Sequence, residues 1–546
     1  MSLLAIAFIV GTTVAPAEPP ASCTAMWRFN ETIGSLPDRK AAYAKLRNIA
    51  DQCIRDGGDG NAYIFRGHGA YDAGDLKSAE SDYREATTLL PASAPAHFDL
   101  GLVEFALGNL DAAIAEYTTY IAIKGNEPDG YNARAKIYLA KRDLVHAIAD
   151  ETQAISLRAD FTDGYRVRAE ARLLSDDFDG AIADCTAGLA AGGTGGFHAL
   201  RGAAYRHKKE FVHAAADLDI AVRNEPDDPL GWKERAQLEM DRSQWDAAIP
   251  DFRQALVLDP QSVWAHQSLG MILRQQKQYD ASIAEYGKAI AVTPDAWDLY
   301  LGRALSEFHK QDYAATVADD TTALSKNPVS EAALSNRGFA YRHLGKLDEA
   351  IADLTRALAM VPNDDAALVE RGIAHRQKHE YDGAEADYDA AISDDPKDSI
   401  AILDRGMLWQ DEKRFDRAEA DFDASAALDP GSWKAQTGRC RIRAIRNHDL
   451  AAGLDACNRA LQIVPGDFDA LDGRGFIKFR LGDLAGALAD YDAALASRPR
   501  AAGSLYMRGV VKLRLGRAAD GKVDADAAAA IDPDIVSVYA GYGVSP

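Results

Sequence analysis

The chain has 546 residues, a net charge of −22 and 47% hydrophobic residues, a composition typical of a folded, water-soluble protein. Acidic residues outnumber basic ones by 83 to 61, and this charge repels nucleic acid and anionic membrane surfaces as partners. Five cysteines are too few for a fold built on disulfides. No segment approaches the about 20 apolar residues that span a bilayer. At about 150 residues per domain, the length alone suggests three or four domains.

The first seventeen residues predict a targeting segment. Residues 3–10 read LLAIAFIV, and Ala15-Pro16-Ala17 resembles a cleavage site before Glu18. We expect residues 1–17 to be a signal peptide and the mature chain to be periplasmic or secreted. The segment before the apolar run has no Lys or Arg. A buried amino-terminal helix or a misassigned start codon is therefore the alternative, and the chain would then be cytoplasmic.

Residues 18–59 read as two helices that form an amino-terminal cap. Cys23 and Cys53 flank the turn at Pro37-Asp38 symmetrically. Both thiols would then lie at the open end of one helix hairpin. A disulfide there would stabilise the cap by roughly 3–4 kcal/mol through loop-closure entropy.

Prolines recur every 34 residues through most of the rest of the chain. The segment RGFAYRHLGKLDEAIADLTRALAMVP ends at Pro362, and the similar segment RGIAHRQKHEYDGAEADYDAAISDDP ends at Pro396. We expect fourteen repeats over residues 60–533, followed by a short tail at 534–546. One interval is a residue short near Gly192–Gly196, where the glycines suggest a flexible joint, and one is a residue long near Asn447–Asp449.

Each repeat reads as two helices joined by a turn. Small or apolar residues recur at helical spacing, as at Leu334, Gly338 and Tyr341 and then at Ala350 and Leu354. The terminal Pro stops the second helix because it has no N–H group and a fixed φ angle. One hairpin cannot bury its apolar face alone, so neighbouring repeats must stack.

This pattern resembles the tetratricopeptide repeat family in its period, its small residues and its terminal Pro. The resemblance covers nearly 90% of the chain and implies an all-α fold, a right-handed superhelical solenoid. It also implies a concave groove lined by the first helix of each repeat, and a partner that is a protein or peptide.

Eleven repeats carry Arg at the seventh position and Asp sixteen residues later. Two repeats have Leu instead, Leu100 and Leu269, with Glu116 and Glu285 at the partner position. We interpret the Arg and Asp residues as an ion-pair ladder that sets the register of the stacked helices; a row of anion-binding arginines is the alternative. The pairs are Arg66 and Asp82, Arg134 and Asp150, Arg168 and Asp184, Arg201 and Asp217, Arg235 and Asp251, Arg303 and Asp319, Arg337 and Asp353, Arg371 and Asp387, Arg405 and Asp421, Arg474 and Asp490, and Arg508 and Asp524.

The longer repeat breaks this ladder, because Arg439 would face Ala456. Cys440 and Cys457 straddle its turn, and a disulfide between them would replace the lost ion pair. Two ordinary buried cysteines are an equally good interpretation of this pair. Cys185 is left over as a buried free thiol.

The family resemblance also predicts which residues line the groove. A groove that is basic and dotted with aromatics would suit an extended acidic peptide or a C-terminal carboxylate. The alternative is that the cations simply stabilise helix C-termini. The groove candidates are Phe105, Arg206, Trp264, Arg274, Phe308, Arg342, His343, Arg376, Phe476 and Arg480.

The repeats leave no room for a separate catalytic domain. His375 and His379 sit four residues apart on one helix but lack a third ligand, and we expect no metal or cofactor. We therefore expect a non-catalytic scaffold that binds a protein or peptide partner. The alternatives are a structural spacer of an envelope secretion or assembly complex, and the regulatory arm of an enzyme.

Overall fold

The computed structural model describes residues 19–34, 36, 38–194 and 196–545. Over these residues the fold is all-α, with 31 helices and no strand. The predicted signal peptide, residues 1–17, lies outside the described residues. None of the helices in the described ranges combines the length and the hydropathy that a bilayer crossing requires.

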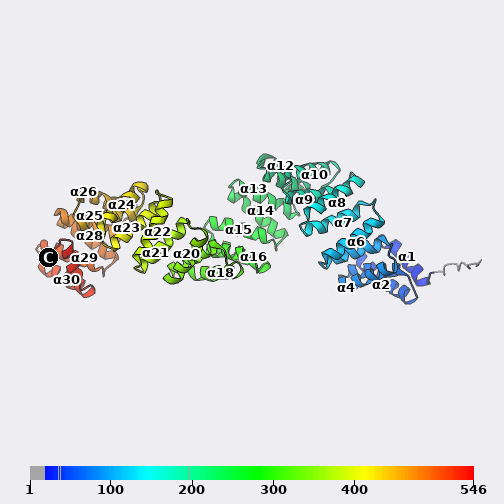
Figure 1. Cartoon of the computed structure of the whole chain (residues 1–546), viewed down its shortest axis with the longest axis horizontal. Helices are drawn as coiled ribbons and strands as arrows, with labels where there is room; N and C mark the ends of the chain where they lie inside the picture. Colours follow the sequence, from blue (N-terminus) through cyan, green and yellow to red (C-terminus); the bar gives the residue numbers. More distant parts are fainter. Residues whose placement is uncertain (1–18, 35, 37, 195, 546) are drawn as a thin grey trace, which may run out of the picture. The chain divides into compact units, whose positions relative to one another are not determined.

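The chain divides into two compact units, Met1–Ala265 and His266–Pro546, and the division falls within helix α15. Each unit is a stack of antiparallel helix hairpins (Figure 1). The helices up to the division are α1 (Ala21–Ile33), α2 (Arg39–Arg55), α3 (Gly60–Asp72), α4 (Leu76–Leu89), α5 (Ala94–Ala106), α6 (Leu110–Ile123), α7 (Pro128–Ala140), α8 (Leu144–Leu157), α9 (Thr162–Leu174), α10 (Phe178–Ala190), α11 (Phe197–His207), α12 (Phe211–Asn224), α13 (Pro229–Asp241), α14 (Trp245–Leu258) and α15 (Val263–Gln275).

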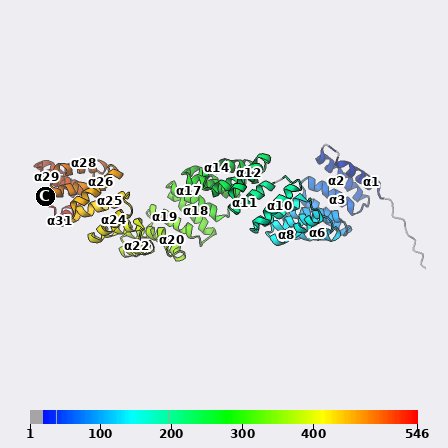
Figure 2. The same cartoon turned by 90° about the horizontal axis from the view of Figure 1, so that it is seen from above.

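The second unit continues the same alternation, as the view in Figure 2 also shows. Its helices are α16 (Tyr279–Val292), α17 (Trp297–His309), α18 (Tyr313–Lys326), α19 (Glu331–His343), α20 (Leu347–Met360), α21 (Asp365–Gln377), α22 (Tyr381–Asp394), α23 (Ser399–Asp411), α24 (Phe415–Leu428), α25 (Trp433–Arg446), α26 (Leu450–Ile463), α27 (Phe468–Leu481), α28 (Leu484–Ser497), α29 (Ala502–Arg514), α30 (Ala518–Ile531) and α31 (Ile535–Gly541). Helices α3 to α30 therefore make fourteen successive pairs within the described residues, and α1 with α2 makes one more before them.

The turn inside a hairpin passes through the left-handed region of backbone conformation. Gly345 has φ +72°, and Lys413 adopts φ +61° at the equivalent turn. An Asp often caps the second helix that follows, as where the Asp483 side chain accepts a hydrogen bond from the Gly486 N–H group.

Small residues let the two helices of a hairpin approach closely. A Cβ atom at Gly338 would lie 2.8 Å from Leu354 Cγ, which is closer than real atoms pack. The core around such contacts is built from fully buried Ala350, Leu354 and Ala357. The 34-residue pattern therefore specifies the spacing between helices as well as their order.

First helices of successive hairpins contact one another within each unit, for example α11 with α13 and α17 with α19. Second helices of successive hairpins have no comparable contacts within the described part of either unit. The first helices therefore lie on the inner side of each unit's stack, and we call the surface that they form the groove.

Each Arg of the predicted ladder pairs with its Asp across the hairpin. The Arg Nε atom donates to the Asp carboxylate over 2.6–3.1 Å in all eleven pairs. Most of the arginines also donate through Nη1 to the preceding repeat, as Arg337 does to Thr321 Oγ1 at 2.9 Å and Arg405 to Asp389 Oδ1 at 2.7 Å. One guanidinium thus joins the helices of a hairpin to each other and to the hairpin before it.

Histidine replaces arginine where the ladder carries Leu. His97 Nδ1 lies 2.6 Å from Glu116 Oε2, and His266 Nδ1 lies 2.6 Å from Glu285 Oε2. Both histidines stand three residues before the Leu that replaces Arg, and both are buried. The longer Glu and the earlier His therefore restore a polar link at the same place.

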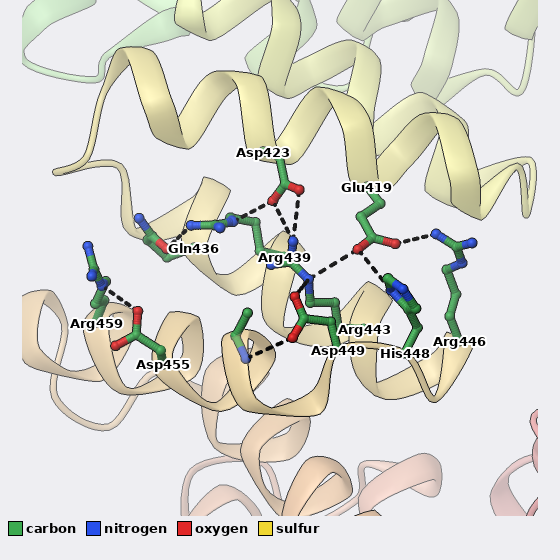
Figure 3. Close-up of polar contacts among 11 residues, drawn as sticks. Glu419, Asp423, Gln436, Arg439, Arg443, Arg446, His448, Asp449, Asp455 and Arg459 are labelled. Atoms are coloured by element: carbon green, nitrogen blue, oxygen red, sulfur yellow. Dashed lines mark hydrogen bonds and ion pairs between the residues drawn. The ribbon is translucent and has the colours of Figure 1, made fainter.

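The longer repeat, α25 with α26, uses a different arrangement (Figure 3). Arg439 Nε donates to Asp423 Oδ1 of α24 at 2.6 Å, and Arg443 Nη2 donates to both oxygens of Asp423 at 3.0 and 2.8 Å. Arg446 pairs with Glu419 of the same helix α24. Arginines thus tie α25 to the preceding hairpin, with Ala456 buried at the position of the missing Asp.

Two disulfides each join the two helices of one hairpin. Cys23 is bonded to Cys53 between α1 and α2, and Cys440 is bonded to Cys457 between α25 and α26. Cys185 is a buried free thiol, and burial raises the pKa of its thiol to about 12. The second disulfide therefore links the hairpin whose seventh-position arginine, Arg439, pairs with Asp423 of the preceding hairpin instead of with its own second helix.

Candidate functional site

Three of the predicted groove arginines form ion pairs between neighbouring first helices. Arg206 pairs with Glu234 at 3.2 Å and with Asp241 at 2.9 Å, all within the groove of the first unit. In the second unit Arg342 pairs with Glu370, and Arg376 pairs with Asp411 at 2.8 Å.

The carboxylate partners of these arginines determine whether the groove can bind an acidic ligand. Each Arg stands in the last turn of its helix, where a cation is favourable, and its carboxylate partner lies on the next first helix. An arginine already paired is poorly available to an acidic peptide. The arrangement favours the alternative in which these cations support the stack.

The predicted aromatic residues at the centre of the second unit form one cluster. The Phe308 ring lies 5.5 Å from Tyr313 and 6.4 Å from Phe339, and His343 stacks on Tyr313 with ring centroids 4.3 Å apart. Burial, helped by Arg342, lowers the pKa of His343, which favours the neutral form of the ring. These rings pack against each other across two neighbouring repeats.

Of the remaining groove candidates, Trp264 and Arg274 interact with neighbouring side chains, whereas Phe105 is exposed. The Trp264 ring packs 5.4 Å from Phe252 and beneath the ammonium of Lys233 at 4.8 Å. Arg274 stands near His309 and contributes to lowering the pKa of that side chain, after burial. Phe105 is 38% exposed and is the most open aromatic among the predicted groove residues.

The last two candidates are covered by the carboxyl-terminal tail, residues 535–545. Phe476 is only 5% exposed, and the Tyr539 ring lies 5.7 Å from it. Arg480 stacks on Phe476 at 4.8 Å and donates a hydrogen bond to the carbonyl oxygen of Tyr542. The tail therefore occupies this end of the groove.

An open pocket of about 580 Å³ lies in the groove of the first unit, between α9, α11 and α13; we call it the α11 pocket. Its apolar surface comes from leucines and an alanine, and charged side chains of both signs surround it. Its lining residues are Arg166, Glu170, Leu173, Leu174, Gly196, Leu200, Ala203, His207, Asp228, Leu230, Lys233 and Glu234.

The pocket arises where one repeat is a residue short. Helix α11 has 11 residues, whereas its neighbours α9 and α13 have 13 each. Gly196 takes a left-handed conformation with φ +73° directly before α11, and its N–H group donates to Glu225 at 2.7 Å. Helix α11 is thus two residues shorter than α9 and α13, and the pocket runs along it from Gly196 to His207. A second hollow, of about 720 Å³, lies beside the same turn and shares Asp228.

The sequence-based groove prediction did not include the leucines of the α11 pocket. It interpreted the glycines at 192–196 as a joint and ranked aromatic and basic positions first. The missing residue was the available signal, because it marks the repeat in which the first helix is shorter than its neighbours. Leu174, 43% exposed, is the most accessible apolar side chain there.

Two buried carboxyl groups occupy positions where most repeats place a large apolar side chain. Glu151 and Asp320 are fully buried, and they accept hydrogen bonds from Asn132 at 2.8 Å and Asn336 at 2.7 Å. Burial raises the pKa of each to about 8. Both lie in the packed core rather than in an open site, so they bear on stability more than on ligand binding.

The structure corrects the expectation that His375 and His379 share one helix, because His375 lies on α21 whereas His379 lies in the following turn with φ +61°. His375 Nδ1 lies 2.8 Å from Glu380, and His379 Nδ1 lies 2.8 Å from the hydroxyl of Tyr381. Over the described ranges, no three His, Cys, Asp or Glu side chains come together as a metal site would require.

Comparison with known proteins gives family matches over much of the chain. A family model described as Tetratricopeptide repeat matches residues 66–128, 210–263, 233–290, 268–319, 315–365, 336–399, 369–432 and 403–468. A second model with the same description matches residues 440–508. No curated protein sequence matches the chain.

Similar solved structures have low sequence identity. The APC/C hetero-tetramer Cut9-Hcn1 is 11% identical with a TM-score of 0.40, over 90% of this chain and 96% of its own. Yeast Tom70 is 15% identical with a TM-score of 0.35, over 82% and 98%. A tetratricopeptide repeat protein from Parabacteroides merdae is 23% identical with a TM-score of 0.36, over 45% and 99%.

The family assignment rests on the sequence models and on the repeated hairpins. Together the models match well over half of the chain, and the matched segments fall on the helix pairs described above. The chain belongs to the tetratricopeptide repeat family.

Proposed function

We propose that this protein is a non-catalytic scaffold that binds a peptide segment of a partner protein in the groove of its first unit. The family's repeats support an interaction role in general. The observation that carries the specific proposal is the α11 pocket, a volume of about 580 Å³ with an apolar surface and a charged surround. Peptide-binding clefts combine apolar anchoring with a few oriented polar groups in this way.

The surroundings of the pocket indicate the chemistry of the ligand. Arg166 and Lys233 oppose Glu170, Asp228 and Glu234, so the field is mixed rather than basic. A peptide with one large apolar anchor side chain and flanking polar residues fits this arrangement better than a strongly acidic one. Hydrogen bonds to the peptide backbone would add orientation.

A displayed library of random 12-residue peptides, selected on the full chain, tests the proposal. Leu174→Arg places a charge at the edge of the pocket, and we expect at least tenfold weaker binding of the selected peptides. Leu157→Arg is the matched control, because Leu157 is a similarly exposed leucine, 37%, at the end of α8 outside the pocket. Peptides that bind both variants equally, or that share no apolar anchor, would contradict the proposal.

Charge reversal separates this proposal from the basic groove considered first. Arg342→Glu and Arg376→Glu should leave binding of the selected peptides unchanged, because both arginines lie in the other unit. Loss of binding in these variants would instead favour an acidic ligand along the second unit.

We further propose that the chain acts outside the cytoplasm, as a scaffold in the periplasm or beyond the cell. The disulfides Cys23–Cys53 and Cys440–Cys457 support this, because such bonds persist in oxidising compartments. Mass spectrometry of the natural protein should give a chain that begins at Glu18 with four oxidised thiols. An intact Met1 with five free thiols would place the protein in the cytoplasm.

A further inference from the structure

Helix α31 contacts α29 and α30, and the tail then folds back along the second unit toward α24. After α31 the backbone turns at Gly543, with φ +73°, and the N–H group of Val544 donates to the carbonyl oxygen of Tyr539 at 2.9 Å. Ile535, Tyr539 and Val544 are buried at 5%, 8% and 3% exposure. A segment of eleven residues is thus held on the protein surface by three buried side chains.

The aromatic side chains of the tail reach several hairpins back along the second unit. The Tyr539 ring lies 5.7 Å from Phe476 of α27 and 5.3 Å from Tyr506 of α29. The Tyr542 ring lies 6.3 Å from Phe415 of α24, and Figure 2 shows α31 near α24 and α25. A helix that served only to cap the last repeat would have no reason to reach α24.

Two arginines of the first helices bind the backbone of the tail. Arg480 donates to the carbonyl oxygen of Tyr542, and Arg514 Nη2 donates to that of Ser545 at 3.1 Å. Unlike Arg342 and Arg376, these two have no carboxylate partner among the described residues of the chain. Every peptide offers carbonyl oxygens, so these donors would serve another peptide equally well.

The tail fills its site incompletely. A partly open cavity of about 210 Å³ remains between it and α25, α27 and α29. Val536 and Val538 are 45% and 36% exposed, and Val538 also lines this cavity. Gly503 gives the Tyr539 hydroxyl its room, since a Cβ atom there would lie 2.8 Å from it. The surface under the tail therefore has space for a larger ligand than the one it holds.

We infer that the surface formed by α25, α27 and α29 is a second peptide-binding site, and that the tail is its intramolecular, autoinhibitory occupant. The external ligand is an apolar peptide with two aromatic side chains three residues apart, like Tyr539 and Tyr542. It enters when it displaces the tail. This site goes beyond the proposed function, because it lies in the other unit and shares no residue with the α11 pocket.

The tether sets how strong the inhibition is. A short linker holds its ligand at an effective concentration of about 1 mM. If the free tail peptide binds with a Kd of about 0.1 mM, competition from the tethered tail weakens the binding of an external peptide roughly tenfold. A measurable difference between the intact and the tail-free chain follows from these values.

A fluorescein-labelled peptide with the sequence of residues 533–545 is the probe, measured by fluorescence anisotropy. We expect it to bind a chain that ends at Asp534 at least tenfold more tightly than the intact chain. Adding Arg480→Leu to the shortened chain should weaken binding at least fivefold. The variant Leu174→Arg should not change it, so failure here is distinguishable from failure of the α11 pocket.

A full-length variant guards against loss of folding on truncation. Tyr542→Ala removes one aromatic contact, and we expect faster hydrogen exchange in residues 535–545 together with tighter probe binding than in the intact chain. Equal probe affinity for intact, shortened and Tyr542→Ala chains would overturn the inference. A concentration-dependent dimer that disappears on shortening would overturn the intramolecular assignment, because the tail would then occupy a second copy.

Discussion

Replacing Arg337 by alanine tests whether the ladder stabilises the fold. Arg337 Nε and Nη2 donate to the two oxygens of Asp353 at 2.6 and 2.9 Å, and Nη1 donates to Thr321 at 2.9 Å. Asp353 is only 5% exposed. The substitution leaves that carboxylate buried without its bidentate partner, although Arg356 stands 3.7 Å away.

The expected cost follows from what is left behind. Removing one member of a buried ion pair costs about 3–5 kcal/mol, and the partial exposure of Arg337 and the nearby Arg356 place this case at the lower end, about 3 kcal/mol. Since each 1.4 kcal/mol is a factor of ten, local opening of α19 and α20 should become roughly 100-fold more frequent.

Hydrogen exchange read by mass spectrometry measures that opening peptide by peptide in the full chain. Protection should fall in α19, α20 and the neighbouring α18, and should be unchanged in the first unit. Unaltered protection in α19 and α20 would refute the ladder as a stabilising element.

Two repeats of this chain suggest a set of substitutions that should compensate for the loss of Arg337. Repeats without the Arg use His, Leu and Glu, as His97, Leu100 and Glu116 do. The equivalent change is Leu334→His, Arg337→Leu and Asp353→Glu together, and it should recover part of the protection that Arg337→Ala loses. No recovery would mean that the histidine link does not substitute for the arginine.

Two further predictions concern buried groups. Burial raises the pKa of Glu151 to about 8, above its value of about 4.3 in an unfolded chain, so the protonated folded state is favoured and stability falls as pH rises from about 4 to 8. Glu151→Gln should reduce that fall by up to about 1.4 kcal/mol per pH unit in urea unfolding, and an unchanged pH profile would show that Glu151 is ionised in the fold. The second prediction concerns the Cys440–Cys457 disulfide. Chemical reduction of this bond, or the double substitution Cys440→Ala and Cys457→Ala, should lower the free energy of unfolding of α25 and α26 by about 3 kcal/mol. The loss should appear as faster hydrogen exchange in these two helices. Equal exchange with and without the bond would contradict a stabilising role.

Much of the fold follows from local sequence. The 34-residue period, the terminal prolines and the small residues such as Gly338 predict helix pairs, and the structure has those pairs from α3 to α30. The prediction works because each repeat buries its apolar face only against its neighbours, so short-range patterns carry nearly all the information. The Arg–Asp spacing followed from the symmetry about a turn, whereas the sequence left a disulfide and two ordinary buried cysteines as equal interpretations of Cys440 and Cys457.

Where repeats differ, the sequence was less informative. Position by position, Arg206 and Arg342 looked like free groove cations, but their partners Glu234 and Glu370 lie on the next first helix. A spacing of 28 residues between partners carries no helical or hairpin signal, so only the stack reveals it. The positive charge of these two arginines, which seemed available to a ligand, is instead paired with carboxylates of the next repeat.

By itself, the sequence determined the repeat, the helix order and the polar link inside each hairpin, because these depend on contacts between neighbours in the chain. Only the tertiary structure decided which parts of the groove are open. The shortened helix α11 opens a pocket between its neighbours, and the tail covers Phe476 and Arg480. Both outcomes depend on how separate hairpins stack, which no single repeat encodes.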